Sequence, residues 1–390
     1  MTLDAATIRA EIPAVAKMVY LTTGWSGPSP TYVVEAIEER LRYESYNGPT
    51  SPEVLESGRQ IRESSKWAAA RLFGATPEEI LLTENTTEGV NVVVNGLSFS
   101  PGDEVVVCDL EHPSVLLPAY SLKATRGVEV KIVSPAPNAS SEEVARLYGE
   151  AIGPRTRLVM LSHVQYSSGL RMPVAEIAAM AHEVGAMVLV DGAQGPGHVA
   201  LDMVELGADF YASPGQKWLL GPDQTGALFV RRELIAELRP ARVGFGFAES
   251  FDQTGDFKER GDDIEKFMVS TTSAPLRAGY LAAVERVLDL GMEAIEARQL
   301  ALAARLKERL SETPGVRVLS PLEGPECSAL TTFAVEGRPA ADVTARLWET
   351  DRKILVRSIS YPSGVRASTS FFNTEEEVEI LADAVGALSV

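Results

Sequence analysis

Short apolar runs that alternate with helical patterns constrain the fold of this chain more than any other feature. Residues 104–108, 158–163 and 187–191 have the length and composition of buried strands, and helical periodicity separates them. Strands that alternate with helices at this spacing form a parallel sheet that is covered by helices. We therefore predict an α/β fold.

Two charged side chains stand at the ends of neighbouring predicted strands. Asp191 ends the strand 187–191, and Lys217 follows the strand end 210–211 after the turn 213–215. A lysine that is held against a sheet end is desolvated, which lowers the pKa of its amine and exposes the neutral nucleophile. This pair suits pyridoxal phosphate, because the lysine binds the cofactor covalently and the acid keeps the pyridinium nitrogen protonated. The alternative is a surface lysine and a turn aspartate.

Two further segments have the pattern of ligand-binding strand ends. The strand 79–83 runs into a hydroxyl-rich turn with Thr86 and Thr87, and a helix begins near Glu88. Backbone N–H groups and the helix dipole would face a phosphate there, although threonine is also an ordinary helix cap. His112 follows the next strand, where its ring either stacks on a pyridine or caps a helix.

Composition and charge exclude several classes of protein. The chain has 390 residues, 45% of them hydrophobic, and a net charge of −18, which disfavours nucleic acid or an anionic membrane as partner. Cys108 and Cys327 form neither a disulfide framework nor a metal-binding pattern, and we expect no metal. We see no apolar run near the roughly 18 residues of a membrane span and no secretory signal pattern. We expect a soluble, cytoplasmic protein.

The pattern of elements indicates two domains. We expect a large cofactor-binding domain over residues 17–275, a smaller α+β domain over 276–390, and an N-terminal arm over 1–16 that packs near the smaller domain. One long helix through about residue 310 should join the two domains. A mostly parallel, helix-covered sheet should form the core of the large domain.

Two segments between the lysine and the joining helix have weaker patterns. Residues 227–230 follow the lysine loop and form a plausible edge strand. Residues 242–266 are rich in glycine, phenylalanine and charge, and they show little periodicity. We expect them to form a long functional loop.

These segments, taken in order, resemble the fold-type I pyridoxal phosphate enzymes of the class V aminotransferase group. The matching segments are 86–87, His112, 191–194, Ser213 with Lys217, 365–368 and 372–374. Within that group, the chain is most similar to the cysteine/cystine C–S lyases. The segments that carry this similarity are 82–87, 111–113, 153–159, 216–218 with 221–222, and 356–358. The chain also resembles, less closely, cysteine desulfurases and isopenicillin N epimerase-like proteins.

The resemblance implies a role at the cofactor ring for four residues. Lys217 is the lysine that binds the cofactor, and Asp191 pairs with the pyridinium nitrogen. His112 stacks on the ring, and Gln194 lies near the phenolic oxygen. Lys217, Asp191 and His112 are therefore the expected catalytic residues.

The resemblance also implies how the cofactor phosphate is held. Thr86, Thr87 and Ser213 would bind it within one subunit. Thr271 or Thr272 would reach the phosphate of the neighbouring subunit. This arrangement implies a homodimer with its active sites at the subunit interface.

Two arginines are the expected substrate ligands. Arg366 would bind the substrate carboxylate as a planar fork, with Arg357 assisting. The chain departs from the group at Gln216, where histidine is usual. The loop 358–364 is short and lacks the cysteine that desulfurases carry before the substrate arginine.

The missing loop cysteine favours a lyase that cleaves the C–S bond of L-cysteine or L-cystine. Its products would be pyruvate, ammonia and sulfide or persulfide. Transamination, epimerisation and desulfuration share the first steps and stay open as alternatives. A binding protein of the same fold without catalysis is disfavoured, because Lys217, Asp191 and Arg366 are all present.

Overall fold

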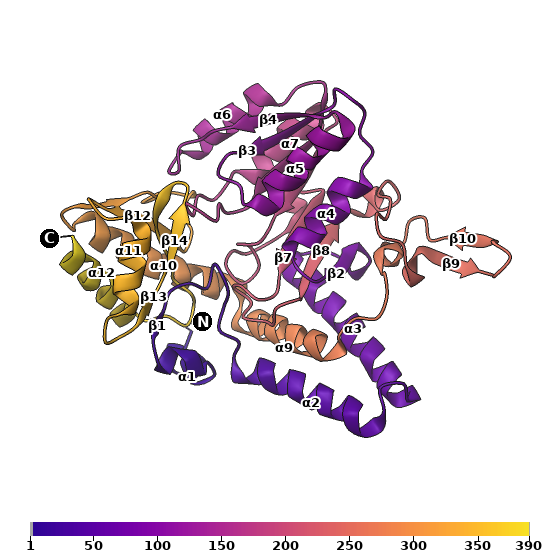
Figure 1. Ribbon diagram of the computed structural model, residues 1–390, viewed down its shortest axis with the longest axis horizontal. Helices are drawn as coiled ribbons and strands as arrows, with labels where there is room; N and C mark the ends of the chain where they lie inside the picture. The colour runs from indigo at the N-terminus through magenta and orange to yellow at the C-terminus, as the bar shows by residue number, and fades with distance from the viewer. Residues whose placement is uncertain (1–2, 390) are drawn as a thin grey trace.

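The computed structural model describes residues 3–389, which are built around two main β-sheets (Figure 1). The larger sheet has seven strands, in the spatial order β2 (Ile80–Thr83), β8 (Gly226–Val230), β7 (Phe210–Pro214), β6 (Met187–Asp191), β5 (Thr156–Ser162), β3 (Glu104–Cys108) and β4 (Glu129–Val133). Only β8 runs in the opposite direction to the other strands of this sheet. The mostly parallel sheet is thus confirmed.

Helices cover both faces of this sheet because its strands are apolar on both sides. Val105 and Val107 of β3 pack on one face, together with side chains from α4 (Thr86–Gly96) and α5 (Pro113–Arg126). Val106 and Cys108 pack on the other face. That face is covered by α3 (Pro52–Phe73), α6 (Ser141–Ala151), α7 (Val174–Glu183) and α9 (Ala274–Leu290). Two further helices are α2 (Thr31–Asn47) and α8 (Met203–Leu206).

The smaller sheet contains C-terminal strands in the order β11 (Val316–Val318), β12 (Leu330–Val335), β15 (Ser363–Ser368) and β14 (Arg357–Ser360). Its helices are α10 (Met292–Ser311), α11 (Ala340–Trp348) and α12 (Glu375–Leu388). The N-terminal strand β1 (Val19–Tyr20) pairs in parallel with β13 (Ile354–Leu355). Leu21 accordingly packs in the same apolar cluster as Leu306 and Phe333. The start of the chain therefore belongs to the C-terminal body, as Figure 1 shows.

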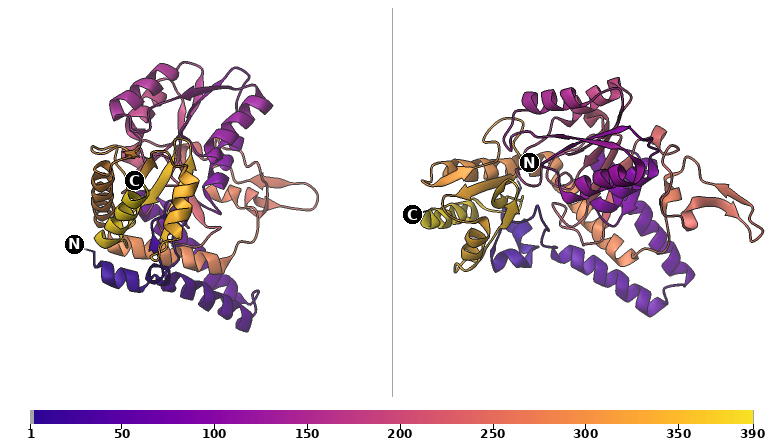
Figure 2. Two further views of the ribbon diagram at one scale, coloured as in Figure 1. Left: turned by 60° about the vertical axis from the view of Figure 1, so that its left-hand side comes forward. Right: turned by 45° about the horizontal axis from the view of Figure 1, so that its top comes forward.

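Three local expectations from the sequence are wrong. Residues 227–230 lie within β8, between β2 and β7, because the chain turns back antiparallel after the lysine loop. The expected single joining helix is broken at Gly291, whose φ of 83° no longer fits a right-handed helix. The expected loop contains a hairpin of β9 (Ala248–Phe251) and β10 (Phe257–Glu259), which projects from the body in Figure 2.

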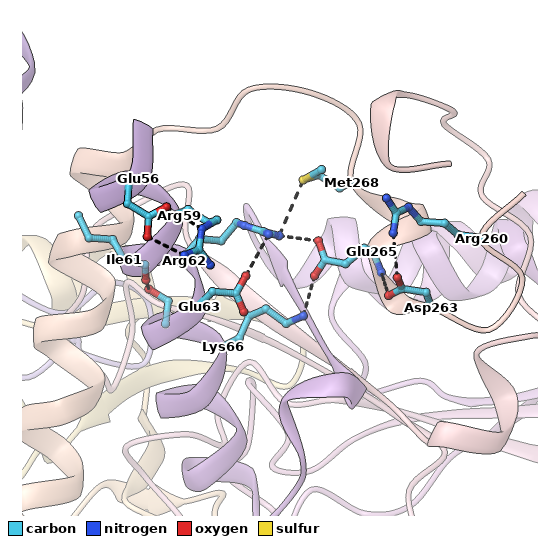
Figure 3. Close-up of polar contacts among 11 residues, drawn as sticks. Glu56, Arg59, Ile61, Arg62, Glu63, Lys66, Arg260, Asp263, Glu265 and Met268 are labelled. Carbon is cyan, nitrogen blue, oxygen red and sulfur yellow. Dashed lines mark hydrogen bonds and ion pairs between the residues drawn. The ribbon is translucent and has the colours of Figure 1, made fainter. Parts of the chain in front are cut away.

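The segment after this hairpin is fixed to α3 by charged side chains (Figure 3). Arg62 contacts one carboxylate oxygen of Glu265 over 2.5 Å, and Lys66 contacts the other over 2.6 Å. Thr271 and Thr272 follow a few residues later and are exposed. The anchor therefore sets the course of the chain just before these two threonines.

The N-terminal arm and the two joining helices each pack against a different part of the molecule. The arm includes α1 (Ala5–Ala10), and its Arg9 forms an ion pair with Glu377 over 2.9 Å. Helix α9 packs against α2 and α3, whereas α10 packs against α12. The division into domains at residues 275 and 276 stays a prediction. Within residues 3–389, we find no helix with the length and apolar character of a membrane span.

Candidate active site

A cavity of about 490 Å³ lies at the carboxyl ends of β5, β6 and β7. This edge is where parallel sheets bind ligands, since the loops and helix N-termini converge there. The predicted site residues that line it are Thr86, Thr87, His112, Asp191, Gln194, Lys217, Arg357 and Arg366. The fold thus brings together residues from both sheets at one cavity.

Lys217 lies on the loop that follows β7, in a position fixed by backbone contacts. Gly215 N–H donates to the Thr225 carbonyl over 2.7 Å, and Gly27 N–H donates to the Gln216 carbonyl over 2.6 Å. Desolvation lowers the pKa of Lys217 to about 8, and the Asp191 carboxylate opposes that shift. A large fraction of this amine is therefore neutral near pH 8, as a nucleophile requires.

Asp191 is buried at the end of β6 and is only half satisfied by the protein. Its Oδ1 accepts a hydrogen bond from Ala193 N–H over 2.8 Å. Its Oδ2 is buried and has no hydrogen-bond partner among the described residues. Burial raises the pKa of Asp191, while Lys217 lowers it. A buried acceptor without a donor is costly, so this oxygen fits a ligand that donates a proton.

Helix α4 points its N-terminus at the cavity. Asn85 caps the helix by accepting from Glu88 N–H over 2.9 Å, so the helix begins at Thr86. Thr86 is buried and Thr87 is exposed. Amide groups, the helix dipole and a hydroxyl in this place suit an anion such as a phosphate.

His112 and Gln194 are oriented by neighbouring groups. His112 Nδ1 accepts from Ser114 N–H over 3.2 Å and so caps α5. Burial, followed by the charges of nearby cations, lowers the pKa of His112 to about 4, so its ring is neutral at neutral pH. Gln194 donates to the Gly24 carbonyl over 2.9 Å and accepts from Trp218 Nε1 over 2.7 Å.

The two arginines come from the smaller sheet. Arg366 on β15 is fully buried and donates from Nη1 to the Tyr166 carbonyl over 2.5 Å. Its Nε and Nη2 have no hydrogen-bond partner within residues 3–389. Burial lowers the pKa of Arg366 to about 9, and Arg357 adds to that shift. The Arg357 guanidinium lies 4.3 Å from the centre of the Trp25 ring.

Three predicted phosphate ligands lie outside this cavity. Ser213 is buried, and its hydroxyl donates to the Ala227 carbonyl over 3.5 Å. Side chains alternate along β7, so its neighbour Pro214 lines the cavity instead. Thr271 and Thr272 line a second cavity, of about 590 Å³, which shares Thr87 with the first.

Several residues that line the cavity have no role assigned from the sequence. Among them are Trp25, Asn85, Ser162 and Tyr166. Trp25 lies in a loop rich in glycine and hydroxyl groups, which was a usable signal. Ser162 and Tyr166 carry no local signal, because the fold alone places them beside Asp191 and Arg366.

Comparison with known proteins identifies the family of this chain. Residues 19–381 match the family model described as aminotransferase class-V. A probable cysteine desulfurase of Methanothermobacter thermautotrophicus is 32% identical over an alignment of 396 positions that covers 97% of this chain and 96% of that protein. An isopenicillin N epimerase of Amycolatopsis lactamdurans is 30% identical over an alignment of 401 positions that covers 98% of each protein.

Solved structures show the same similarity in space. The complex of the cystine C–S lyase C-DES with its reaction product cysteine persulfide has a TM-score of 0.90 and 30% identity, over 96% of this chain and 99% of that one. A C-DES mutant with glycine covalently linked to its pyridoxal phosphate cofactor has a TM-score of 0.91 and 29% identity, over 99% of both chains.

These findings confirm the predicted resemblance, the fold-type I architecture and the enzyme class. The predicted cofactor is the one that the solved relative carries. The orphaned Asp191 oxygen and the N-terminus of α4 fit the ring nitrogen and the phosphate of that cofactor. The chain is an enzyme of the class-V aminotransferase family.

Proposed function

We propose that the cavity binds pyridoxal phosphate and cleaves the C–S bond of a cysteine- or cystine-type substrate by β-elimination. When bound, the cofactor supplies an electron sink for the charge that develops at Cα. The similarity to a cystine C–S lyase supports this proposal, as does the set of residues at the cavity. The expected products are pyruvate, ammonia and sulfide from cysteine, or pyruvate, ammonia and cysteine persulfide from cystine.

Each wall of the cavity would hold one part of the cofactor. Asp191 would accept a hydrogen bond from the ring nitrogen through its unpartnered Oδ2. Thr86 and the first turn of α4 would hold the phosphate, and Lys217 would bind the cofactor covalently. The neutral ring of His112 would lie against the pyridine ring, with Gln194 near the phenolic oxygen.

Arg366 has the free nitrogen atoms that a substrate carboxylate needs. Its Nε and Nη2 form one edge of the guanidinium fork, and both lack a partner among the described residues. A bidentate contact there would orient the substrate for loss of its Cα proton. The neutral amine of Lys217, favoured by burial, would accept that proton. Arg357, which contacts the exposed Trp25, would bind a second carboxylate, such as that of cystine.

The absence of cysteine among the lining residues is the observation that most favours elimination over desulfuration. Cys108 is buried in β3, and burial raises the pKa of its thiol. Cys327 lies outside the cavity, and its Sγ contacts the Pro321 carbonyl over 3.3 Å. Elimination needs no acceptor thiol: cysteine and one water yield pyruvate, ammonia and hydrogen sulfide.

Cysteine desulfurase is the second candidate, because several relatives bear that name. Pyruvate and alanine should be measured separately after incubation with L-cysteine and with L-cystine, in the parent protein and in Cys108→Ser and Cys327→Ser. We expect pyruvate as the main product and little change in either variant. Alanine as the main product, lost with either cysteine, would restore the desulfurase assignment.

The exposed position of Thr271 and Thr272 supports a homodimer. Both threonines line the second cavity, which borders the first at Thr87. A second copy of the chain would place its own threonines at this border. Sedimentation velocity measures the oligomeric state, and a monomer at micromolar concentration would contradict the shared site.

A further inference from the structure

Glu111 is a buried carboxylate at the active site that none of the proposed steps uses. It lies between β3 and α5, directly before His112, and only 2% of its surface is exposed. It accepts three hydrogen bonds: from Ser162 N–H over 2.9 Å, from Ser162 Oγ over 2.5 Å and from Gln165 Nε2 over 2.6 Å. All three donors are neutral, and no lysine or arginine of residues 3–389 forms an ion pair with Glu111. Burying a carboxylate without a neighbouring cation costs folding free energy. Such a group is therefore expected to have a specific task.

The ionised form of Glu111 matches its surroundings. Its two oxygens accept from three donors, and an ionised carboxylate is a pure acceptor with room for about four such hydrogen bonds. Burial raises the pKa of Glu111 to about 7, and the hydrogen bonds from Ser162 and Gln165 oppose this shift. The three contacts thus keep a large share of Glu111 charged at neutral pH.

One path leads from Glu111 to the substrate arginine. Gln165 is fully buried, and the turn that begins with it is closed by two backbone hydrogen bonds of 2.8 Å. These bonds run from Gln165 N–H to the Leu170 carbonyl and from Gly169 N–H to the Gln165 carbonyl. The next residue, Tyr166, offers the carbonyl that holds Arg366. Anchoring the Gln165 side chain therefore fixes the carbonyl on which the guanidinium rests.

A second path leads from Glu111 to the cofactor side of the cavity. Ser162 ends β5 and lines the cavity, and it is the register partner of Asp191 on β6. His112, the residue after Glu111, meets the Tyr166 ring edge-on with 5.0 Å between ring centres. Ser162, residues 165–166 and His112 are thus all connected to a single carboxylate.

We propose that Glu111 is a positioning residue that aims the free edge of Arg366 at the substrate carboxylate, acting through Gln165 and the Tyr166 carbonyl. The inference rests on the proposed function only in taking Arg366 as the carboxylate ligand. Arg366 has a single described hydrogen bond, at Nη1. The direction of its remaining nitrogen atoms therefore depends on where that one carbonyl stands. Glu111 acts at a distance and does not touch the substrate.

Glycine is the appropriate probe, because it carries the α-carboxylate and amine but has no β-substituent to eliminate. Its dissociation constant can be measured from the visible spectrum of the cofactor-loaded protein. We expect Glu111→Ala and Gln165→Ala each to raise this constant about ten-fold, the effect of losing one buried hydrogen-bonded partner. Glu111→Gln keeps the shape and part of the hydrogen bonding, and it should recover most of the affinity. The dissociation constant of pyridoxal phosphate from Gln165→Ala should change by less than about two-fold, because the Ser162 contact remains.

A double-mutant cycle separates positioning from a general loss of structure. In an Arg366→Lys background, Glu111→Ala and Gln165→Ala should weaken glycine binding by less than about two-fold. The guanidinium that Glu111 and Gln165 position is absent from that background. Glu104→Gln is the matched control: Glu104 is a buried carboxylate at the start of β3, the strand that precedes Glu111, and it is paired with Lys131 and Arg155. It should leave glycine affinity unchanged.

Two results would overturn the proposal. One is glycine binding in Gln165→Ala that equals the parent protein. The other is an equal loss with and without Arg366→Lys, which would indicate a structural role. If Glu111→Ala does not fold, Gln165→Ala carries the test alone. Glycine binding does not require elimination, so the binding test can still be interpreted if the proposed lyase reaction does not occur.

Discussion

The indole N–H of Trp218, the residue after Lys217, donates to Gln194 Oε1 over 2.7 Å. The Trp218 ring is also stacked on His198, with 4.0 Å between ring centres and 15° between planes. His198 in turn accepts from Ala329 N–H, just before β12, over 2.9 Å. The smaller sheet therefore reaches Gln194 through two buried rings.

Trp218→Phe should destabilise the protein and alter the cofactor's surroundings. The change leaves the buried Gln194 Oε1 without its donor, which costs about 1–3 kcal/mol of unfolding free energy. We expect a lower midpoint in urea and a shifted visible spectrum of the loaded protein. Trp67→Phe is the control, because Trp67 is 59% exposed and should change stability by at most about 0.5 kcal/mol. Equal stability of both variants would contradict the role of Trp218.

Lys217 should be the residue that pyridoxal phosphate modifies. Burial lowers the pKa of Lys217 to about 8, so its amine becomes neutral as the pH rises through 8. The rate of covalent attachment to the cofactor-free protein should rise with a midpoint near pH 8 and level off above it. A midpoint above pH 10 would mean an ordinary exposed lysine. Borohydride reduction and peptide mapping should label Lys217, and Lys217→Ala should remove the label.

Asp191→Ala should retain the fold and lose most of the activity. The variant takes away the only buried carboxylate oxygen that is free to accept from the ring nitrogen among the described lining residues. We expect kcat to fall at least about 100-fold, comparable to the loss of a strong electrostatic contact in a transition state. Asp289→Ala changes an exposed aspartate on α9 and should leave kcat unchanged. Near-normal kcat in Asp191→Ala would make Asp191 structural.

Arg366→Lys should weaken every substrate that carries an α-carboxylate. Lysine keeps the charge but lacks the planar fork, so kcat/KM should fall about ten-fold or more. The loss should be similar for L-cysteine and L-cystine, because the contact ignores the side chain. Steady-state kinetics with both substrates provide the measurement. A loss confined to one of them would place Arg366 at the side chain instead.

The sequence predicted the parts of the site that depend on local signals. Apolar runs and turn residues located the strand ends with Asp191 and Lys217, and a hydroxyl-rich turn located Thr86. Glu111 could not be assigned a role in this way, because Ser162 and Gln165 lie far along the chain and meet it only through the sheet.

Two errors in the expected fold have identifiable physical causes. Helical periodicity continues on both sides of Gly291, so the break between α9 and α10 depends on one backbone angle. The place of β8 inside the sheet depends on strand pairing, which periodicity does not encode. The local sequence pattern thus predicts where each helix or strand lies in the chain. Contacts between distant residues decide which of these elements lie side by side.

The pairing of β1 with β13 determines when the active site can be completed during synthesis. The ribosome makes β1 several hundred residues before its partner at Ile354. Trp25, which follows β1, contacts Arg357, which follows β13, so the mouth of the cavity is formed by two distant parts of the chain. A nascent chain can fold its large sheet and still lack this mouth. Synthesis of the segment from β13 to β15 is therefore the event that allows the protein to bind a substrate, and a chain stopped before β13 should bind cofactor without binding amino acids.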